Sequence, residues 1–224
     1  MARMLPYDST WEDMSDYVVH FTRPEGSRSD YDNMLNICWE RVLKPGGAFG
    51  LARDRAPEPK SQFAVCMSEI PLHQLRRLAK RRGEYAIGFK KHFILSRGGG
   101  PIWYVEKGGT IASAINALID RAQHSPQSAV EPLWTLTPFV DVPGDYSGKP
   151  YRFEWEREWR HVGELRFSEA DVGLLVLPEG LHEKARRFFV DHEQGGTGPA
   201  YLCPYIDASW NRKQIRSALF GSGT

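Results

Sequence analysis

The sequence predicts a single α+β domain with a mixed, split β-sheet core and flanking helices. Runs of β-branched and apolar residues recur at strand length, as at 17–22 and 172–177. Helical periodicity occurs between such runs, most clearly over 110–123. On that predicted helix, apolar residues at helical spacing are Ile111, Ile115, Leu118 and Ile119. Helices and strands do not alternate regularly, which disfavours a doubly wound parallel sheet.

Length and composition are those of an ordinary globular protein. The 224 residues are 41% hydrophobic and 25% charged, with a formal net charge of +1. A chain of this length buries a core without disulfides. We therefore assign residues 1–224 to one domain, with a loose arm over 1–15 and a variable tail over 191–224. The near-neutral charge gives no global field that would draw the chain to nucleic acid or anionic lipid, although local basic patches remain open.

The cysteines and the N-terminal segment predict a cytoplasmic protein. Cys38, Cys66 and Cys203 are odd in number and widely spaced, which is neither a disulfide framework nor a zinc pattern. The first residues carry acids and have no apolar core of a signal peptide. No stretch reaches the length of a membrane span. We expect no membrane association and no metal site.

Local signals predict the elements that carry the polar motifs. A helix is expected from about Ser29 to Leu43, ended by the Lys44-Pro45-Gly46-Gly47 sequence. A strand is expected over 84–89. A long strand is expected over 152–162, because apolar and polar residues alternate there.

The first candidate site is the His20-Phe21-Thr22 sequence of the opening strand. The two-residue period of a strand places His20 and Thr22 on one face. Polar side chains beside an apolar strand need protein partners or a ligand. The structural interpretation, a sheet-edge histidine with a hydrogen-bonded threonine, is favoured when the motif is taken alone.

The second candidate is the acidic face of the predicted strand 152–162. Glu154, Glu156, Glu158 and Arg160 would share that face, and neighbouring carboxylates repel one another unless they are solvated or paired. One interpretation is a solvated outer face over a tryptophan-lined core. The other is a carboxylate pair in a cleft, where one group binds a sugar hydroxyl and the other handles a proton. The sequence favours neither.

Two further features have a structural and a functional interpretation. Tyr85 is more often an ordinary core tyrosine than a ring that stacks on a ligand. The helix predicted over 72–82 carries a basic face, which is more often solvated than bound to phosphate or to a partner. The residues of that face are Arg76, Arg77, Lys80, Arg81 and Arg82.

The order of these motifs resembles that of ADP-ribosyltransferases of the His-Tyr-Glu type. His20 and Thr22 come first, then Tyr85, then Glu158. The opening strand also resembles that of DarT-type enzymes. The resemblance implies an ADP-ribosyltransferase-like fold that cleaves NAD, used as a substrate, and transfers ADP-ribose to a protein or nucleic-acid acceptor.

The residue roles come from the same resemblance. His20 and Thr22 would hold the nicotinamide ribose, and Tyr85 would stack on the nicotinamide. Glu158 would stabilise the oxocarbenium-like transition state. Glu156 would deprotonate the acceptor. Arg23 or Arg160 would pair with the pyrophosphate.

A second resemblance is to the AbiGi-like abortive-infection family of bacteria, whose members are nominally antitoxins. It covers roughly residues 17 to 180. The stretches that carry it are Cys66–Leu72, Gly83–Phe89, Pro138–Val142 and Glu156–Arg160. It implies a phage-defence protein with a cognate toxin or antitoxin.

Enzymatic activity stays open at this point, because a non-catalytic antitoxin or phage-sensing protein on the same scaffold is the alternative. On that alternative, the basic helix with Arg76, Arg77, Lys80 and Arg81 is the contact with the partner. A nucleic-acid acceptor steered by the same face is the third hypothesis.

Overall fold

The computed structural model describes residues 13–146, 149–151 and 154–221. Contacts group the chain into two compact units with interleaved segments. Unit 1 comprises Met1–Val42, Ser68–Phe93 and Arg166–Thr224, and unit 2 comprises Leu43–Met67 and Ile94–Leu165. Among the described residues, no helix is both long enough and apolar enough to cross a bilayer. The assignment of one domain to the whole chain stays a prediction.

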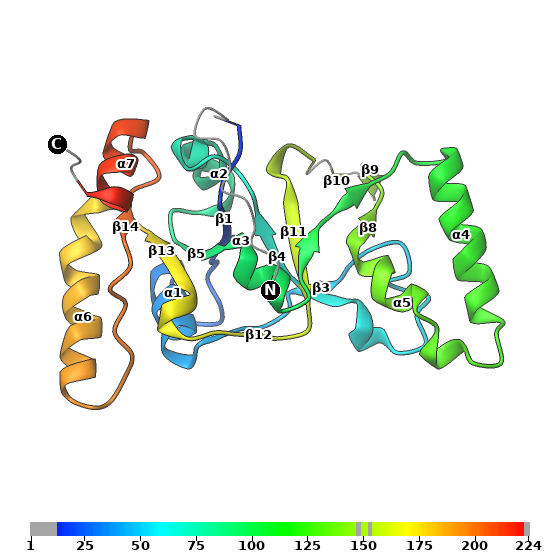
Figure 1. Ribbon diagram of the computed structural model, residues 1–224, viewed down its shortest axis with the longest axis horizontal. Coiled ribbons are helices and arrows are strands. Elements are labelled where there is room, and N and C mark those ends of the chain that lie inside the picture. The colour runs from blue at the N-terminus through cyan, green and yellow to red at the C-terminus, as the bar shows by residue number, and fades with distance from the viewer. Residues whose placement is uncertain (1–12, 147–148, 152–153, 222–224) are drawn as a thin grey trace. The chain divides into compact units, whose positions relative to one another are not determined.

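Unit 1 is built on a mixed sheet (Figure 1). Its strands, in spatial order, are β14 (Tyr205–Ile206), β13 (Val172–Val176), β5 (Ala86–Lys90) and β1 (Tyr17–Phe21). β1 and β13 flank β5 in antiparallel orientation, and β14 runs parallel to β13. Gly88 of β5 opposes Val19 and lies under the Leu174 side chain, where a Cβ atom would collide. A larger residue at position 88 would therefore force the Leu174 side chain to move.

Helices cover this sheet and complete the core of unit 1. They are α1 (Asp30–Glu40), α2 (Leu75–Arg82) after the 3-10 turn η2 (Leu72–Gln74), α6 (His182–Gln194) and α7 (Arg212–Phe220), with short turns at Glu169–Asp171 and Glu179–Leu181. α3 (Lys91–Ser96) begins in unit 1 and continues into unit 2. Trp39 of α1 packs edge-on to His192 of α6, with ring centroids 4.9 Å apart. The buried Tyr201 hydroxyl donates to Cys38 O at 2.6 Å, so the segment after α6 is fixed to α1.

Unit 2 consists of short strands and one long helix (Figure 1). Its elements are β3 (Gly47–Ala48), β4 (Phe63–Ser68, whose last residue is in unit 1), β6 (Gly100–Pro101), β7 (Trp103–Tyr104), α4 (Thr110–Gln123), α5 (Leu133–Leu136), β8 (Val140–Asp141), β9 (Gly144–Tyr146), β10 (Lys149–Tyr151) and β11 (Glu158–Val162). Short 3-10 turns lie at Pro59–Gln62, Ser128–Val130, Thr137–Phe139 and Glu154–Glu156. β2 (Val42–Leu43) and β12 (Leu165–Arg166) lie where the chain passes between the units.

The mixed α+β class and most predicted elements are confirmed, and two boundaries were wrong. α1 is capped by Ser29 as expected, but it ends at Glu40 because Arg41 adopts the left-handed conformation with φ 54°. The predicted continuation to Leu43 is instead β2. β5 begins at Ala86, so Tyr85 precedes the strand. The ADP-ribosyltransferase-like architecture stays a prediction.

The long strand expected over 152–162 was also wrong. Residues 154–156 form a 3-10 turn, and Arg157 has φ 48°, which breaks any extended run. β11 therefore starts only at Glu158. Glu158 and Arg160 share a strand face as predicted, whereas Glu154 and Glu156 do not belong to it.

Candidate functional site

The opening strand gives its threonine protein partners in unit 1. Thr22 is 1% exposed, and its Oγ1 donates to Asp30 O at 2.9 Å, with Tyr85 O at 3.3 Å. His20 is half-buried in β1 opposite Ile87. The hydroxyl of Thr22 thus holds the start of α1 against the segment before β5.

Tyr85 lies beside Tyr31 of α1, and this corner of unit 1 contains unsatisfied polar atoms. The two ring centroids are 5.4 Å apart. Burial raises the pKa of both phenols, followed by the neighbouring Tyr85 for Tyr31 and by the charge of Asp30 for Tyr85. Asn33 is 7% exposed and donates to Arg23 O at 2.8 Å, but its Oδ1 is buried without a partner, as is Tyr31 Oη. Buried polar atoms are usually satisfied, and positions 31 and 33 of α1 do not face each other, so these are two separate unsatisfied groups, of which Tyr31 Oη lies beside Tyr85.

Glu158 and Arg160 form a buried ion pair in unit 2. Glu158 is 8% exposed and Arg160 has no exposed surface. Arg160 Nε donates to Glu158 Oε1 at 2.7 Å, and the Tyr104 hydroxyl donates to Glu158 Oε2 at 2.5 Å. Both oxygens of the predicted catalytic carboxylate are therefore engaged by the protein.

The guanidinium of Arg160 has further partners in the same unit. Its Nη2 donates to Asp141 Oδ2 at 2.9 Å and its Nη1 to Pro138 O at 2.7 Å, and the Phe49 ring lies 4.6 Å from Cζ. One guanidinium thus joins two carboxylates and a carbonyl, a planar arrangement to which arginine is suited. Burial, and next the charge of Glu158, raise the pKa of the nearby Cys66 thiol. This cluster stabilises the interior of unit 2 and offers no exposed charge to a ligand.

The residues predicted for one site fall into two groups. Unit 1 brings Thr22 and Tyr85 together, and Arg23 is linked to the same corner through Asn33. Unit 2 brings Glu158 and Arg160 together, with Glu156 buried at 3% exposure in the turn before them. A single cleft that joins both groups, and the assigned roles, stay predictions.

The basic residues predicted to contact a partner occupy α2 as expected from the helical pattern. Leu75 and Leu78 are buried beneath it, while Arg76, Arg77, Lys80 and Arg81 are exposed. They lie outside both groups of site residues described above, so α2 presents a separate charged face of unit 1.

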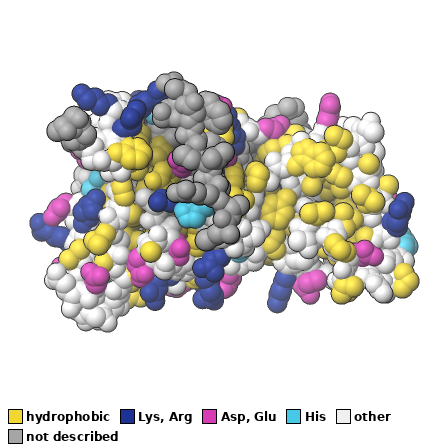
Figure 2. Space-filling view, in the orientation of Figure 1, with side chains coloured by type: hydrophobic (Ala, Val, Ile, Leu, Met, Phe, Trp, Pro, Cys, Tyr) yellow, Lys and Arg dark blue, Asp and Glu magenta, His cyan; other side chains and the backbone are white. Residues whose placement is uncertain are grey.

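Exposed apolar side chains on several elements of unit 2 were not predicted from the sequence. In the described part of the chain, seven exposed large hydrophobic side chains belong to this unit: Phe63, Leu95, Trp103, Ile111, Leu118, Val130 and Leu136. Figure 2 shows hydrophobic side chains gathered over the region of α5 and β8. Ile111 and Leu118 are 48% and 46% exposed, although they lie on the helix that was expected to bury them. Soluble proteins rarely expose apolar side chains in groups unless a partner covers them.

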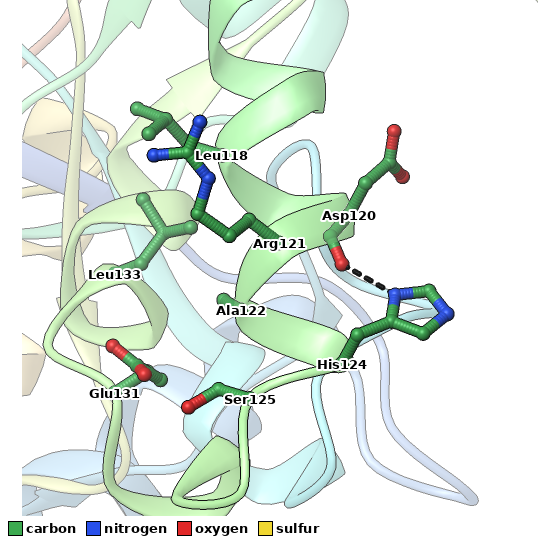
Figure 3. Close-up of a pocket in the computed structure, with 8 residues that line it drawn as sticks. All are labelled: Leu118, Asp120, Arg121, Ala122, His124, Ser125, Glu131 and Leu133. Carbon is green, nitrogen blue, oxygen red and sulfur yellow. Dashed lines mark hydrogen bonds between the residues drawn. The ribbon is translucent and has the colours of Figure 1, made fainter.

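A pocket of about 700 Å³ adjoins this surface, between the second half of α4 and the segment that leads into α5. Its lining residues are Leu118, Asp120, Arg121, Ala122, His124, Ser125, Glu131 and Leu133. Figure 3 shows Leu118, Arg121 and Leu133 on one side of the pocket, while the His124 ring is held by Asp120 O at 2.7 Å from Nδ1. The pocket combines the apolar side chains of Leu118 and Leu133 with Arg121 and Glu131, while the Asp120 carboxylate is paired with Arg55.

The clue to this surface was the width of the apolar stripe on α4. Ile119 and Ala122 face the core with Trp134. Ile111 and Leu118 make the apolar stripe wider than is needed for one side of the helix to face the core. A count of apolar positions around the helix could have indicated a second apolar face.

The family of the chain is shown by a family model that matches residues 47–184. Its description reads "Putative abortive phage resistance protein AbiGi, antitoxin". The chain belongs to the AbiGi family. Neither a curated protein nor a solved structure matches it. The match covers the whole of unit 2 except its first four residues, and it therefore includes the apolar surface.

Proposed function

We propose that this AbiGi protein acts in abortive-infection phage defence as an antitoxin that neutralises a cognate toxin by binding it. The observation that carries the proposal is the group of exposed apolar side chains on unit 2, within the matched region. Neutralisation by binding requires a surface that excludes water from the contact. It does not require a reactive group. The exposed face of α4 and its pocket supply such a surface.

The toxin contact is centred on Ile111 and Leu118. They are separated by seven positions on α4 and therefore lie on one face of the helix. Leu118 also lines the pocket, next to Arg121 and Glu131, which provide polar contacts at its rim. Interfaces of this kind depend on a few desolvated apolar anchors.

The proposal predicts that Ile111→Asp/Leu118→Asp abolishes neutralisation. A candidate toxin, whose expression alone arrests host growth, would be expressed with each variant; host growth and the Kd of the purified pair would be measured. Loss of two central anchors is expected to weaken binding by at least about 100-fold. The matched control is Leu202→Asp/Phe220→Asp, which changes two exposed hydrophobics of unit 1.

Equal neutralisation by the α4 variant and the control would contradict the role of this surface. Absence of neutralisation by the wild-type protein, together with no binding to the candidate toxin, would contradict the antitoxin function itself. Circular dichroism of each variant establishes that the fold is retained.

We propose NAD binding as a second function, because the Tyr31–Tyr85 contact contains a buried unsatisfied oxygen, Tyr31 Oη. The Oη of Tyr31, beside Tyr85, would accept from or donate to the amide or ribose of NAD. The tilted Tyr85 ring could stack on nicotinamide. ADP-ribose transfer would further require Glu158 to exchange its present partners for a ribose hydroxyl.

NAD at 1 mM is expected to raise the melting temperature of the wild-type protein, because a ligand that binds only the native state stabilises it. Tyr85→Leu should remove this rise, and ADP-ribose, which lacks nicotinamide, should give a smaller one. The surface variant Ile111→Asp/Leu118→Asp serves as the control and should respond as wild type. An unchanged melting temperature with NAD would refute the second function and leave the antitoxin proposal intact.

A further inference from the structure

Two basic segments that lie far apart in the chain meet on unit 1. The first is η2–α2, and the second is α7 at the C-terminal end of the described chain. Arg212 Nη2 of α7 lies 3.5 Å from His73 Nε2 of η2, which places the two segments in contact. Figure 2 shows lysine and arginine side chains over the α7 and α2 end of the molecule.

The charge of this surface is strongly one-sided. Its exposed or partly exposed cations are Arg76, Arg77, Lys80, Arg81, Arg82, Arg212, Lys213 and Arg216. Neither 71–83 nor 209–221 contains an acidic residue. The chain has 29 basic and 28 acidic residues, and these two segments hold eight of the 29 cations, with Glu69, Glu84 and Asp207 within two residues of the segment ends. A local field of this size is independent of the net charge.

Part of this arrangement of cations costs folding stability, although Lys80, Arg81 and Arg82 occupy the last turn of α2, where the helix dipole favours positive charge. Like charges repel at i and i+4 of a helix, as at Arg76 with Lys80, Arg77 with Arg81 and Arg212 with Arg216. Arg212 and Lys213 also occupy the first turn of α7, where the helix dipole disfavours positive charge. Two acids lie near the start of α7 and keep their negative charges: Asp207 accepts from Glu179 N, and Glu179 accepts from Trp210 Nε1.

Four of the cations have no ion pair with another described residue: Arg76, Lys80, Lys213 and Arg216. A basic surface spread over two helices, in which four cations have no ion pair with another described residue, matches a polyanion with regularly spaced charges.

We infer that the α2–α7 surface binds the phosphate backbone of a nucleic acid. Arginine and lysine contacts to phosphate position a nucleic acid without reading its sequence. The surface lies on unit 1 and involves none of the residues assigned to the toxin contact. The inference therefore stands or falls separately from the antitoxin proposal.

The test measures binding of a labelled 20-base-pair DNA duplex and a 20-nucleotide single-stranded RNA by fluorescence anisotropy at several salt concentrations. If about four phosphates are neutralised, affinity should fall by about 100-fold between 50 and 200 mM salt. Lys80→Glu/Lys213→Glu should weaken binding by about tenfold or more and reduce the salt slope by about two. The control Lys60→Glu/Arg187→Glu carries the same change in net charge and should bind as wild type.

Three results would overturn the inference. One is the absence of binding to either nucleic acid at 50 mM salt. Another is an equal effect of the α2–α7 variant and its control, which would indicate a non-specific charge effect. The third is tighter binding of a poly-glutamate peptide than of either nucleic acid, which would identify an acidic protein as the partner. Lys80→Gln/Lys213→Gln, which adds no acid, should give a smaller loss in the same direction.

Discussion

Replacement of Arg160 by methionine is expected to lower the free energy of unfolding by about 3–5 kcal/mol. Methionine fills part of the volume but leaves Glu158 and Asp141 without the guanidinium that joins them. Both carboxylates are buried, so neither can be solvated in compensation without local opening. Pro138 O loses its donor as well. Urea denaturation of the purified variant measures the change.

The control for this experiment is Arg187→Met on α6. Arg187 forms an exposed ion pair with Glu183, so its loss should change stability by less than about 1 kcal/mol. The triple variant Arg160→Met/Glu158→Gln/Asp141→Asn removes the unpaired charges and should be more stable than Arg160→Met alone. Two results would show that the cluster is not a coupled unit. One is a loss of stability below about 1 kcal/mol for Arg160→Met. The other is a triple variant that is less stable than Arg160→Met alone.

Lys91→Met is expected to destabilise unit 1 by a similar amount, about 3–5 kcal/mol. Lys91 is 2% exposed, and its Nζ lies 2.5 Å from Glu69 Oε1. Methionine preserves the aliphatic stem but leaves the Glu69 carboxylate buried without its ammonium partner. Chemical denaturation again provides the measurement.

The neighbouring residue supplies a matched control for this pair. Lys90 is exposed at the end of β5, so Lys90→Met should change stability by less than about 1 kcal/mol. Lys91→Met/Glu69→Leu replaces both charges with apolar groups and should recover much of the loss. If the double variant is no more stable than Lys91→Met, the interaction between the two side chains does not account for the effect.

The sequence was informative where local signals decide the structure. Ser29 followed by the periodic apolar residues of α1 located the start of that helix, since a cap and a periodic face are both local properties. Strands β1 and β13 were recognised from their β-branched and apolar composition. Each of these elements is specified by adjacent residues.

The sequence was uninformative where the local structure depends on a single backbone angle or on a residue far away in the chain. The alternation of acids and tryptophans before Glu158 is typical of a strand, but the positive φ of Arg157 interrupts it, and arginine carries no sequence signal for that conformation. Arg160 was expected to bind phosphate. Its pairing with Asp141, nineteen residues earlier, depends on β8 and β11 and could not be read from spacing.

The interleaving of the two units has a consequence for biosynthesis and for dissection of the protein. β5 leaves the ribosome long before β13, the strand that pairs with its second edge. A nascent or truncated chain that ends before residue 172 therefore presents an open backbone edge, the feature that promotes aggregation and attracts proteases. No single cleavage separates one complete unit from the other, because segments of the two units alternate along the sequence. Interaction maps of this protein will depend on point substitutions in the full-length chain, since deletion fragments will lack strands from unit 1.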